Sequence, residues 1–85
     1  MINWSERESM GAGFAKTEIT SSTSGDTRTT TVYGGYAPSD NASDSDEGWS
    51  IQKTVIEDNG TTKIITEKWA VGSWTNRASL TYKYL

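Results

Sequence analysis

The clearest alternation of apolar and polar residues along the chain lies in residues 49–70. Apolar and polar side chains alternate through Trp49–Glu57, and they do so again through Thr61–Ala70, after the turn sequence Asp58-Asn59-Gly60. Alternation with a period of two is typical of β-strands that bury one face, and Asn-Gly is a strong hairpin signal. This segment therefore predicts a β-hairpin.

Two registers are open for this hairpin, and they place different side chains opposite each other. A two-residue Asn-Gly turn pairs Asp58 with Thr61, whereas a three-residue turn that ends on glycine pairs Glu57 with Thr61. The second register sets Trp49 opposite Trp69 and separates apolar from polar residues better, so we favour it. The same face then carries three further apolar residues: Ile51, Val55 and Ile65. A slip of one residue would invert the two faces, which makes the register testable.

The N-terminal half predicts a second, less regular hairpin. Residues 14–21 alternate loosely, residues 22–26 are typical of a turn, and the β-branched residues of 27–33 favour an extended strand. The pair Gly34-Gly35, soon followed by Pro38, is expected to stop or bend the second strand. Residues 39–48 then form a polar, acidic connection.

The C-terminal residues predict a fifth strand. After a connection over 71–77, residues 78–85 alternate, and Leu80, Tyr82 and Tyr84 share one face. Together with the two hairpins, this segment gives about five strands and little or no helix. We therefore expect an all-β fold, a small antiparallel β-sandwich or partly closed barrel, in which residues 14–85 form a single small domain.

Residues 1–13 are expected to form an arm or a short helix ahead of this domain. Ser5 and Glu8 have the spacing of a capping box, but two glycines follow closely, so an isolated helical turn would be marginal. We favour an extended arm that orders on a neighbouring molecule, with Ile2 and Trp4 as its anchors. A frayed terminus is equally compatible with the sequence.

The core that this chain can build from aliphatic residues is small. The 85 residues include two Leu, six Ile, three Val and one Phe, together with four Trp and four Tyr. Domains of this size are marginal even with a good core, and they usually gain stability from disulfides, metals or partners. The chain has no Cys and no His, which excludes a disulfide and argues against a zinc or iron site. Partner subunits are therefore the expected supplement.

Charge and hydropathy argue against several classes of partner. The net charge is −3 and the basic residues form no patch, so we expect no nucleic-acid ligand. No run of about 20 apolar residues exists, so we expect no membrane span. The first residues lack the basic start and apolar centre of a secretory signal, which favours synthesis and use in the cytoplasm.

The sequence contains no recognisable catalytic or cofactor-binding set. Catalysis by Ser or Thr usually needs a His as base, and this chain has none. The carboxylates of residues 39–48 lack the order of a calcium loop. Gly34-Gly35 lacks the lysine that follows a phosphate-binding loop. We therefore expect a protein that is not an enzyme and that needs no cofactor or metal.

The aromatic residues are the main candidates for function. In a small β fold with few aliphatic residues, aromatic rings more often form core or subunit interface than a platform for sugars, which remains the alternative. Arg77 lies between a tryptophan-containing connection and the last predicted strand, where it can bridge to a carboxylate or stack on an indole. The predicted interface or core anchors are Trp4, Trp49, Trp69, Trp74, Arg77, Tyr82 and Tyr84.

Four sequence blocks over residues 33–82 resemble a family of short proteins found among the virion genes of tailed bacteriophages. The blocks occur in the family's order and read GYAP at 35–38, WSIQK at 49–53, WAVGS at 69–73 and WTNRASLTY at 74–82. The last block is the most specific. The third and fourth blocks are adjacent here, so a loop present in relatives is reduced, and residues 1–32 match no part of the pattern.

The resemblance implies a structural component of the virion, present in multiple copies, rather than an enzyme. Its implied partners are other virion structural proteins and copies of itself, and its implied location is the virion, after synthesis in the host bacterial cytoplasm. Head decoration, neck and tail positions are all compatible with it. A surface-exposed module that binds a carbohydrate or receptor is the alternative.

Overall fold

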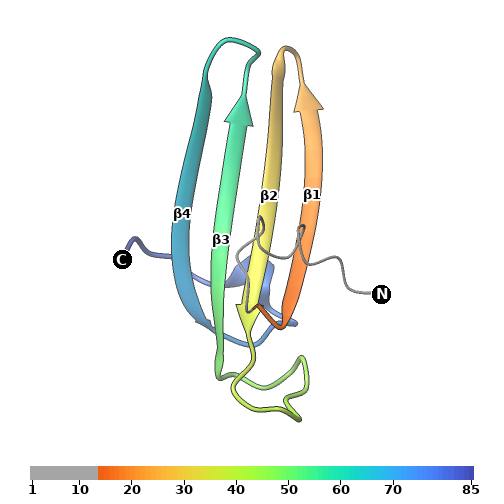
Figure 1. Cartoon of the computed structure of the whole chain (residues 1–85), viewed down its shortest axis with the longest axis vertical. Coiled ribbons are helices and arrows are strands. Elements are labelled where there is room, and N and C mark those ends of the chain that lie inside the picture. Colours follow the sequence, from red (N-terminus) through yellow and green to blue (C-terminus); the bar gives the residue numbers. More distant parts are fainter. Residues whose placement is uncertain (1–13) are drawn as a thin grey trace.

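Residues 14–85, which the computed structural model describes, form one open antiparallel sheet of four strands. The strands are β1 (Lys16–Ser24), β2 (Thr27–Tyr36), β3 (Trp49–Asp58) and β4 (Lys63–Gly72), and they lie in the order β1-β2-β3-β4 (Figure 1). A 3-10 helix, η1 (Arg77–Ser79), follows β4. The all-β prediction is confirmed, but the sheet is neither a sandwich nor a partly closed barrel.

The first hairpin, β1–β2, is longer and tighter than the sequence predicted. Ser24 pairs with Thr27, so only Gly25 and Asp26 form the turn. Gly25 has a φ of 60°, which a glycine adopts without strain and which suits the first central position of a type II′ turn. The serines and threonines of the expected turn therefore continue the strand.

The register of the β3–β4 hairpin differs from the predicted one. Trp49 pairs with Gly72 and Asp58 pairs with Lys63, so the expected pairing of Trp49 with Trp69 is wrong. The turn spans four residues, because the Asn59 Oδ1 accepts hydrogen bonds from the backbone N–H groups of Thr61 and Thr62, at 3.0 and 2.7 Å. The Asp58 carboxylate accepts a further hydrogen bond from Gly60 N. These local side-chain acceptors fix a longer loop than the one assumed.

The shift in register changes which side chains share a face. Along β3, Trp49 and Ile51 point to one face, and their partners on β4 are the small residues Gly72 and Ala70. Trp69 and Ile65 point to the other face, because successive strand residues alternate. The predicted apolar face that joined Ile65 to Ile51 is therefore not formed.

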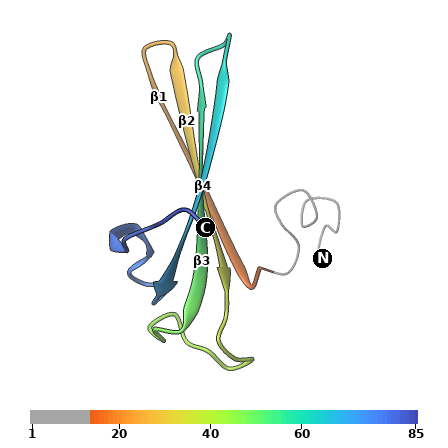
Figure 2. The same ribbon diagram turned by 90° about the vertical axis from the view of Figure 1, so that its left-hand side faces the viewer.

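Ala78–Leu85, predicted as a closing strand, instead forms part of a segment that lies over one face of the sheet. Figure 2 shows residues 73–85, in blue, on one side of the strands. This C-terminal segment makes a single β-bridge, between Lys83 and Trp69. The face that it covers is called the covered face below, and the opposite face is called the open face.

The core lies between the covered face and the C-terminal segment. Its buried apolar residues are Trp49, Ile51 and Trp74, of which Ile51 is fully enclosed. Half-buried residues surround them: Tyr33, Ala37, Ala42, Leu80 and Tyr82. The core is as thin as the composition predicted.

Candidate subunit interface

The C-terminal segment is held on the covered face by apolar side chains that pack over glycines of the sheet. The Trp74 ring lies where a side chain on Gly35 would stand: a Cβ there would be 2.7 Å from the indole. Leu80 lies in the same way over Gly72. Gly34 and Gly35 both belong to β2, so the predicted break at this pair is wrong. Because glycine has no side chain, the two residues make room for the rings of Phe14 and Trp74.

The β2–β3 connection accepts hydrogen bonds from both β3 and the C-terminal segment. The indole N–H of Trp49 donates to the carbonyl oxygen of Ser43 at 3.0 Å, and the backbone N–H of Thr75 donates to the carbonyl oxygen of Asp44 at 3.0 Å. Lys16 and the Asp44 carboxylate form an ion pair at 2.6 Å. The connection, the core and β1 are therefore joined at one end of the sheet.

Arg77 has the bridging role that the sequence predicted. Its guanidinium donates to both carboxylate oxygens of Glu18, at 3.2 and 2.7 Å, and to the Trp74 carbonyl oxygen at 2.9 Å. It also lies 4.8 Å from the centroid of the Trp74 ring. The hydrogen bonds from Arg77 lower the pKa of Glu18 below its ordinary value, and those same bonds raise the pKa of Arg77. Arg77 thus ties the C-terminal segment to the edge strand β1.

The other predicted anchors are divided between the two faces. Trp49, Trp74 and Tyr82 lie on the covered face, where the Tyr82 hydroxyl donates to the Arg77 carbonyl oxygen at 2.8 Å. Trp69 is half-buried on the open face, Tyr84 is exposed, and Trp4 lies outside the described residues. The predicted arm or short helix over 1–13 also lies outside them.

The open face carries an apolar surface that was not predicted from the sequence. Ile19, Tyr36, Ile65 and Val71 are all at least 40% exposed. The half-buried residues on the same face, by register, are Val32, Ile56 and Trp69. The Phe14 ring packs over Gly34 and beside Tyr36, with ring centroids 4.7 Å apart. Only the register could have brought these residues together, because they come from all four strands.

Tyr36 and Trp69 form a parallel aromatic pair on this face. Their rings are stacked, with an interplanar angle of 6° and centroids 6.2 Å apart. The face continues into a hollow of about 480 Å³, which Trp69 and Val71 line together with residues of the C-terminal segment. A flat aromatic pair beside a hollow can contact either a protein side chain or a ring-shaped ligand.

The outer edge of β1 is a second unpartnered feature. β1 pairs with β2 along Lys16–Ser24, and within residues 14–85 no strand pairs with its other side. Its sequence, KTEITSSTS, contains no proline and a single lysine, so it has little of what usually protects an edge. Such an edge can accept an added strand from another molecule.

Two other kinds of feature are absent from the described part of the chain. Residues 14–85 contain no helix with the length and apolar character of a membrane span. Over the same stretch, no three His, Cys, Asp or Glu side chains gather closely enough to hold a metal ion.

No family model, curated protein or solved structure matches the chain.

Proposed function

We propose that this protein is a non-enzymatic structural component of a tailed bacteriophage virion, assembled in multiple copies as a head decoration, neck or tail subunit. The observation that carries the proposal is the open face. Ile19, Ile65 and Val71 expose more than half of their surface there, whereas only three apolar side chains are buried among residues 14–85. Exposed apolar surfaces of this kind usually mark contacts with other proteins.

A neighbouring subunit on the open face would supply the second layer of the sandwich that the sequence favoured. Two sheets pack face to face at about 10 Å, with their apolar side chains interdigitated. The unpaired edge of β1 offers a second contact, through strand addition. The blocks that resemble the virion proteins support the same assignment, because Gly35, Trp49 and Trp74, from three of them, meet in the core.

The test is co-sedimentation of the purified protein with heads, necks and tails of the phage whose genome encodes it. Binding to one of these assemblies is expected, and Ile65→Lys with Val71→Lys should abolish it while the far-ultraviolet circular dichroism stays unchanged. Thr61→Lys, in the exposed β3–β4 turn, is the matched control and should bind normally. A stable monomer without affinity for any part of the particle would contradict the proposal. Flanking genes that encode no virion proteins would also count against it.

A carbohydrate- or receptor-binding module of the virion surface is the second candidate function, and the stacked pair Tyr36–Trp69 favours it. Sugars stack on flat aromatic surfaces, and the adjoining hollow offers polar groups from Ser50 and Lys83. Titration of tryptophan fluorescence with host polysaccharides tests this function. In a Trp4→Phe background the signal should change while Trp69 is present and should stay constant in Trp69→Leu, since Trp49 and Trp74 are buried. A signal that stays constant across a broad panel of polysaccharides would contradict it.

A further inference from the structure

Two lysines stand directly opposite each other on the covered face. Lys53 of β3 and Lys68 of β4 are partners in the antiparallel register, so their Cβ atoms are about 5 Å apart. Like charges in this arrangement destabilise a sheet. Within residues 14–85, the ion pairs involve Lys16, Lys63 and Arg77, and neither Lys53 nor Lys68 pairs with a carboxylate. The fold therefore keeps two cations together without neutralising them.

Aromatic rings position both ammonium groups. The Lys53 Nζ lies 5.5 Å from the Tyr82 ring centroid and 5.8 Å from that of Tyr33. The Lys68 Nζ lies 4.8 Å from the Tyr84 ring centroid. A cation–π contact holds an ammonium group but does not use up its N–H donors. Both lysines are thus oriented and can still donate hydrogen bonds to an anion.

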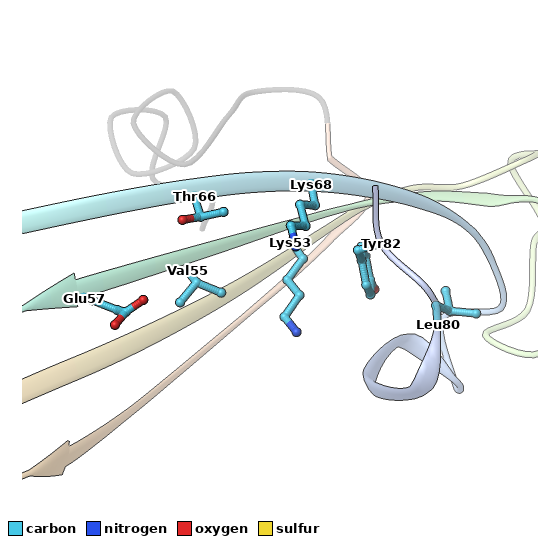
Figure 3. Close-up of a pocket in the computed structure, with 7 residues that line it drawn as sticks. All are labelled: Lys53, Val55, Glu57, Thr66, Lys68, Leu80 and Tyr82. Carbon is cyan, nitrogen blue, oxygen red and sulfur yellow. The ribbon is translucent and has the colours of Figure 1, made fainter. Parts of the chain in front are cut away.

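The two lysines line an open groove of about 340 Å³ between the sheet and the C-terminal segment. Figure 3 shows the Lys53 side chain beside the Tyr82 ring, with Lys68 on the neighbouring strand. The other lining residues are Val55, Glu57, Thr66, Leu80 and Tyr82. Glu57 supplies one negative charge, so the lining side chains keep a net positive charge. The volume suits one or two acidic side chains of a peptide segment.

The chain itself carries an acidic segment with carboxylates that take no part in the ion pairs of residues 14–85, and one of them, Asp46, accepts a hydrogen bond from the Ser43 backbone N–H at 3.0 Å. Asp40, Asp46 and Glu47 of the β2–β3 connection are exposed, whereas Asp44 pairs with Lys16 of the same copy. The connection lies beyond the ends of β2 and β3 (Figure 1), and the bonds from Trp49 and Thr75 fix it there. The groove runs the other way along β3, from Lys53 to Glu57. The segment is therefore held away from the groove of its own copy.

We propose that the groove at Lys53 and Lys68 is a carboxylate-binding site, and that its occupant is the acidic segment, residues 39–48, of a second copy of this chain. The inference deepens the proposed function, because it names a contact between copies of a subunit. The contact joins two different surfaces, so it is head-to-tail and can extend from copy to copy as a ring or a filament. Because charges that remain accessible to solvent carry it, added salt weakens it.

Sedimentation velocity over a range of protein concentrations, at low and at high salt, tests the proposal. The wild-type protein should sediment faster as its concentration rises at low salt, and this increase should disappear at high salt. The groove variant Lys53→Gln/Lys68→Gln and the segment variant Asp46→Asn/Glu47→Gln should each sediment as a monomer. The matched controls remove the same charges elsewhere and should behave as wild type: Lys63→Gln/Lys83→Gln for the groove and Asp26→Asn/Glu67→Gln for the segment.

An equimolar mixture of the two variants provides the sharpest result. The segment variant retains a working groove, and the groove variant retains a working segment, so the mixture should form a dimer and nothing larger. A peptide of residues 38–48 should, in addition, shift the NMR signals of Lys53 and Lys68 in the wild-type protein, which keeps the test valid if the groove variant does not fold. A wild-type protein that stays monomeric at low salt, or a mixture that forms no dimer, would overturn the inference. Particle binding that survives in both variants would leave the proposed function intact in that case.

Discussion

The indole rings of Trp49 and Trp74 pack against each other on the covered face, with centroids 5.7 Å apart and planes inclined by 41°. Trp49 begins β3, whereas Trp74 belongs to the C-terminal segment, so this contact joins the sheet to the segment that covers it. Both rings are almost fully buried, at 2% and 6% exposure. Among residues 14–85 the core contains one further buried apolar residue, Ile51, so this pair is the principal source of hydrophobic stabilisation there.

Replacing either indole of this pair should strongly destabilise the fold. Trp49→Ala or Trp74→Ala is expected to cost about 3–5 kcal/mol, because a large buried ring leaves a cavity in a core that cannot close around it. Trp69→Ala removes a half-buried ring on the open face, and it should cost only about 1–2 kcal/mol. Urea unfolding followed by circular dichroism measures all three variants. Equal losses of unfolding free energy in Trp69→Ala and Trp74→Ala would contradict the division of the tryptophans between two faces.

Gly35 should tolerate no side chain while Trp74 is present. A Cβ at this position would stand 2.7 Å from the Trp74 ring and 3.0 Å from the Trp49 ring, so Gly35→Ala is expected to cost about 1–3 kcal/mol through overpacking. In a Trp74→Ala background the same substitution should cost less, because the nearer of the two obstructing rings is gone. A double-mutant cycle of unfolding free energies measures this coupling. Additive effects would show that the two residues are not in contact.

The ion pair of Glu18 and Arg77 should make the free energy of unfolding decrease as the pH becomes acidic. Hydrogen bonds from Arg77 hold the pKa of Glu18 below its ordinary value of 4.5 in the folded protein. The ionised carboxylate therefore stabilises the fold at pH values above 4.5, and this contribution is lost as the pH falls through the lowered pKa. The difference in unfolding free energy between wild type and Glu18→Gln should be constant near neutral pH and shrink in acid. A difference that does not change with pH would contradict the pairing.

Tyr82 should make the free energy of unfolding decrease as the pH becomes alkaline, the opposite direction to the effect of Glu18. Burial raises the pKa of its phenol to about 12, from an ordinary value of 10.0. Because the folded state disfavours the phenolate, the stabilising contribution is complete below pH 10 and is lost as the pH rises from there towards 12. Tyr82→Phe removes this dependence, along with the hydrogen bond to the Arg77 carbonyl. Unfolding measured at a series of alkaline pH values, with phenolate absorbance recorded, tests this prediction. If Tyr82→Phe lost stability over the same pH range as the wild type, the loss would belong to another titrating group.

Local sequence signals located the four strands, but the same signals also predicted a fifth strand over 78–85 that does not form. The alternation of residues 49–57 and the β-branched run of 27–33 lie within β3 and β2, and Gly25 and Gly60 mark turns in which they take positive φ values. The sequence also allowed Arg77 to bridge to a carboxylate or to stack on an indole, and the structure shows both contacts. Its actual partner, Glu18, was not predictable, since 59 residues separate the two.

The sequence by itself determined that this chain is β-rich, that its core is thin and that its aromatic residues must supply most of that core. These properties depend on composition and on short-range alternation, which neighbouring residues fix. Only the tertiary structure decided which aromatic residues share a face. The Asn59 side chain lengthened the β3–β4 turn and so changed the register, and Trp74 took the position over Gly35 beside Trp49. Trp69 was thereby left on the open face, because pairing across a sheet depends on contacts distant in sequence, and a small shift in register inverts an entire strand.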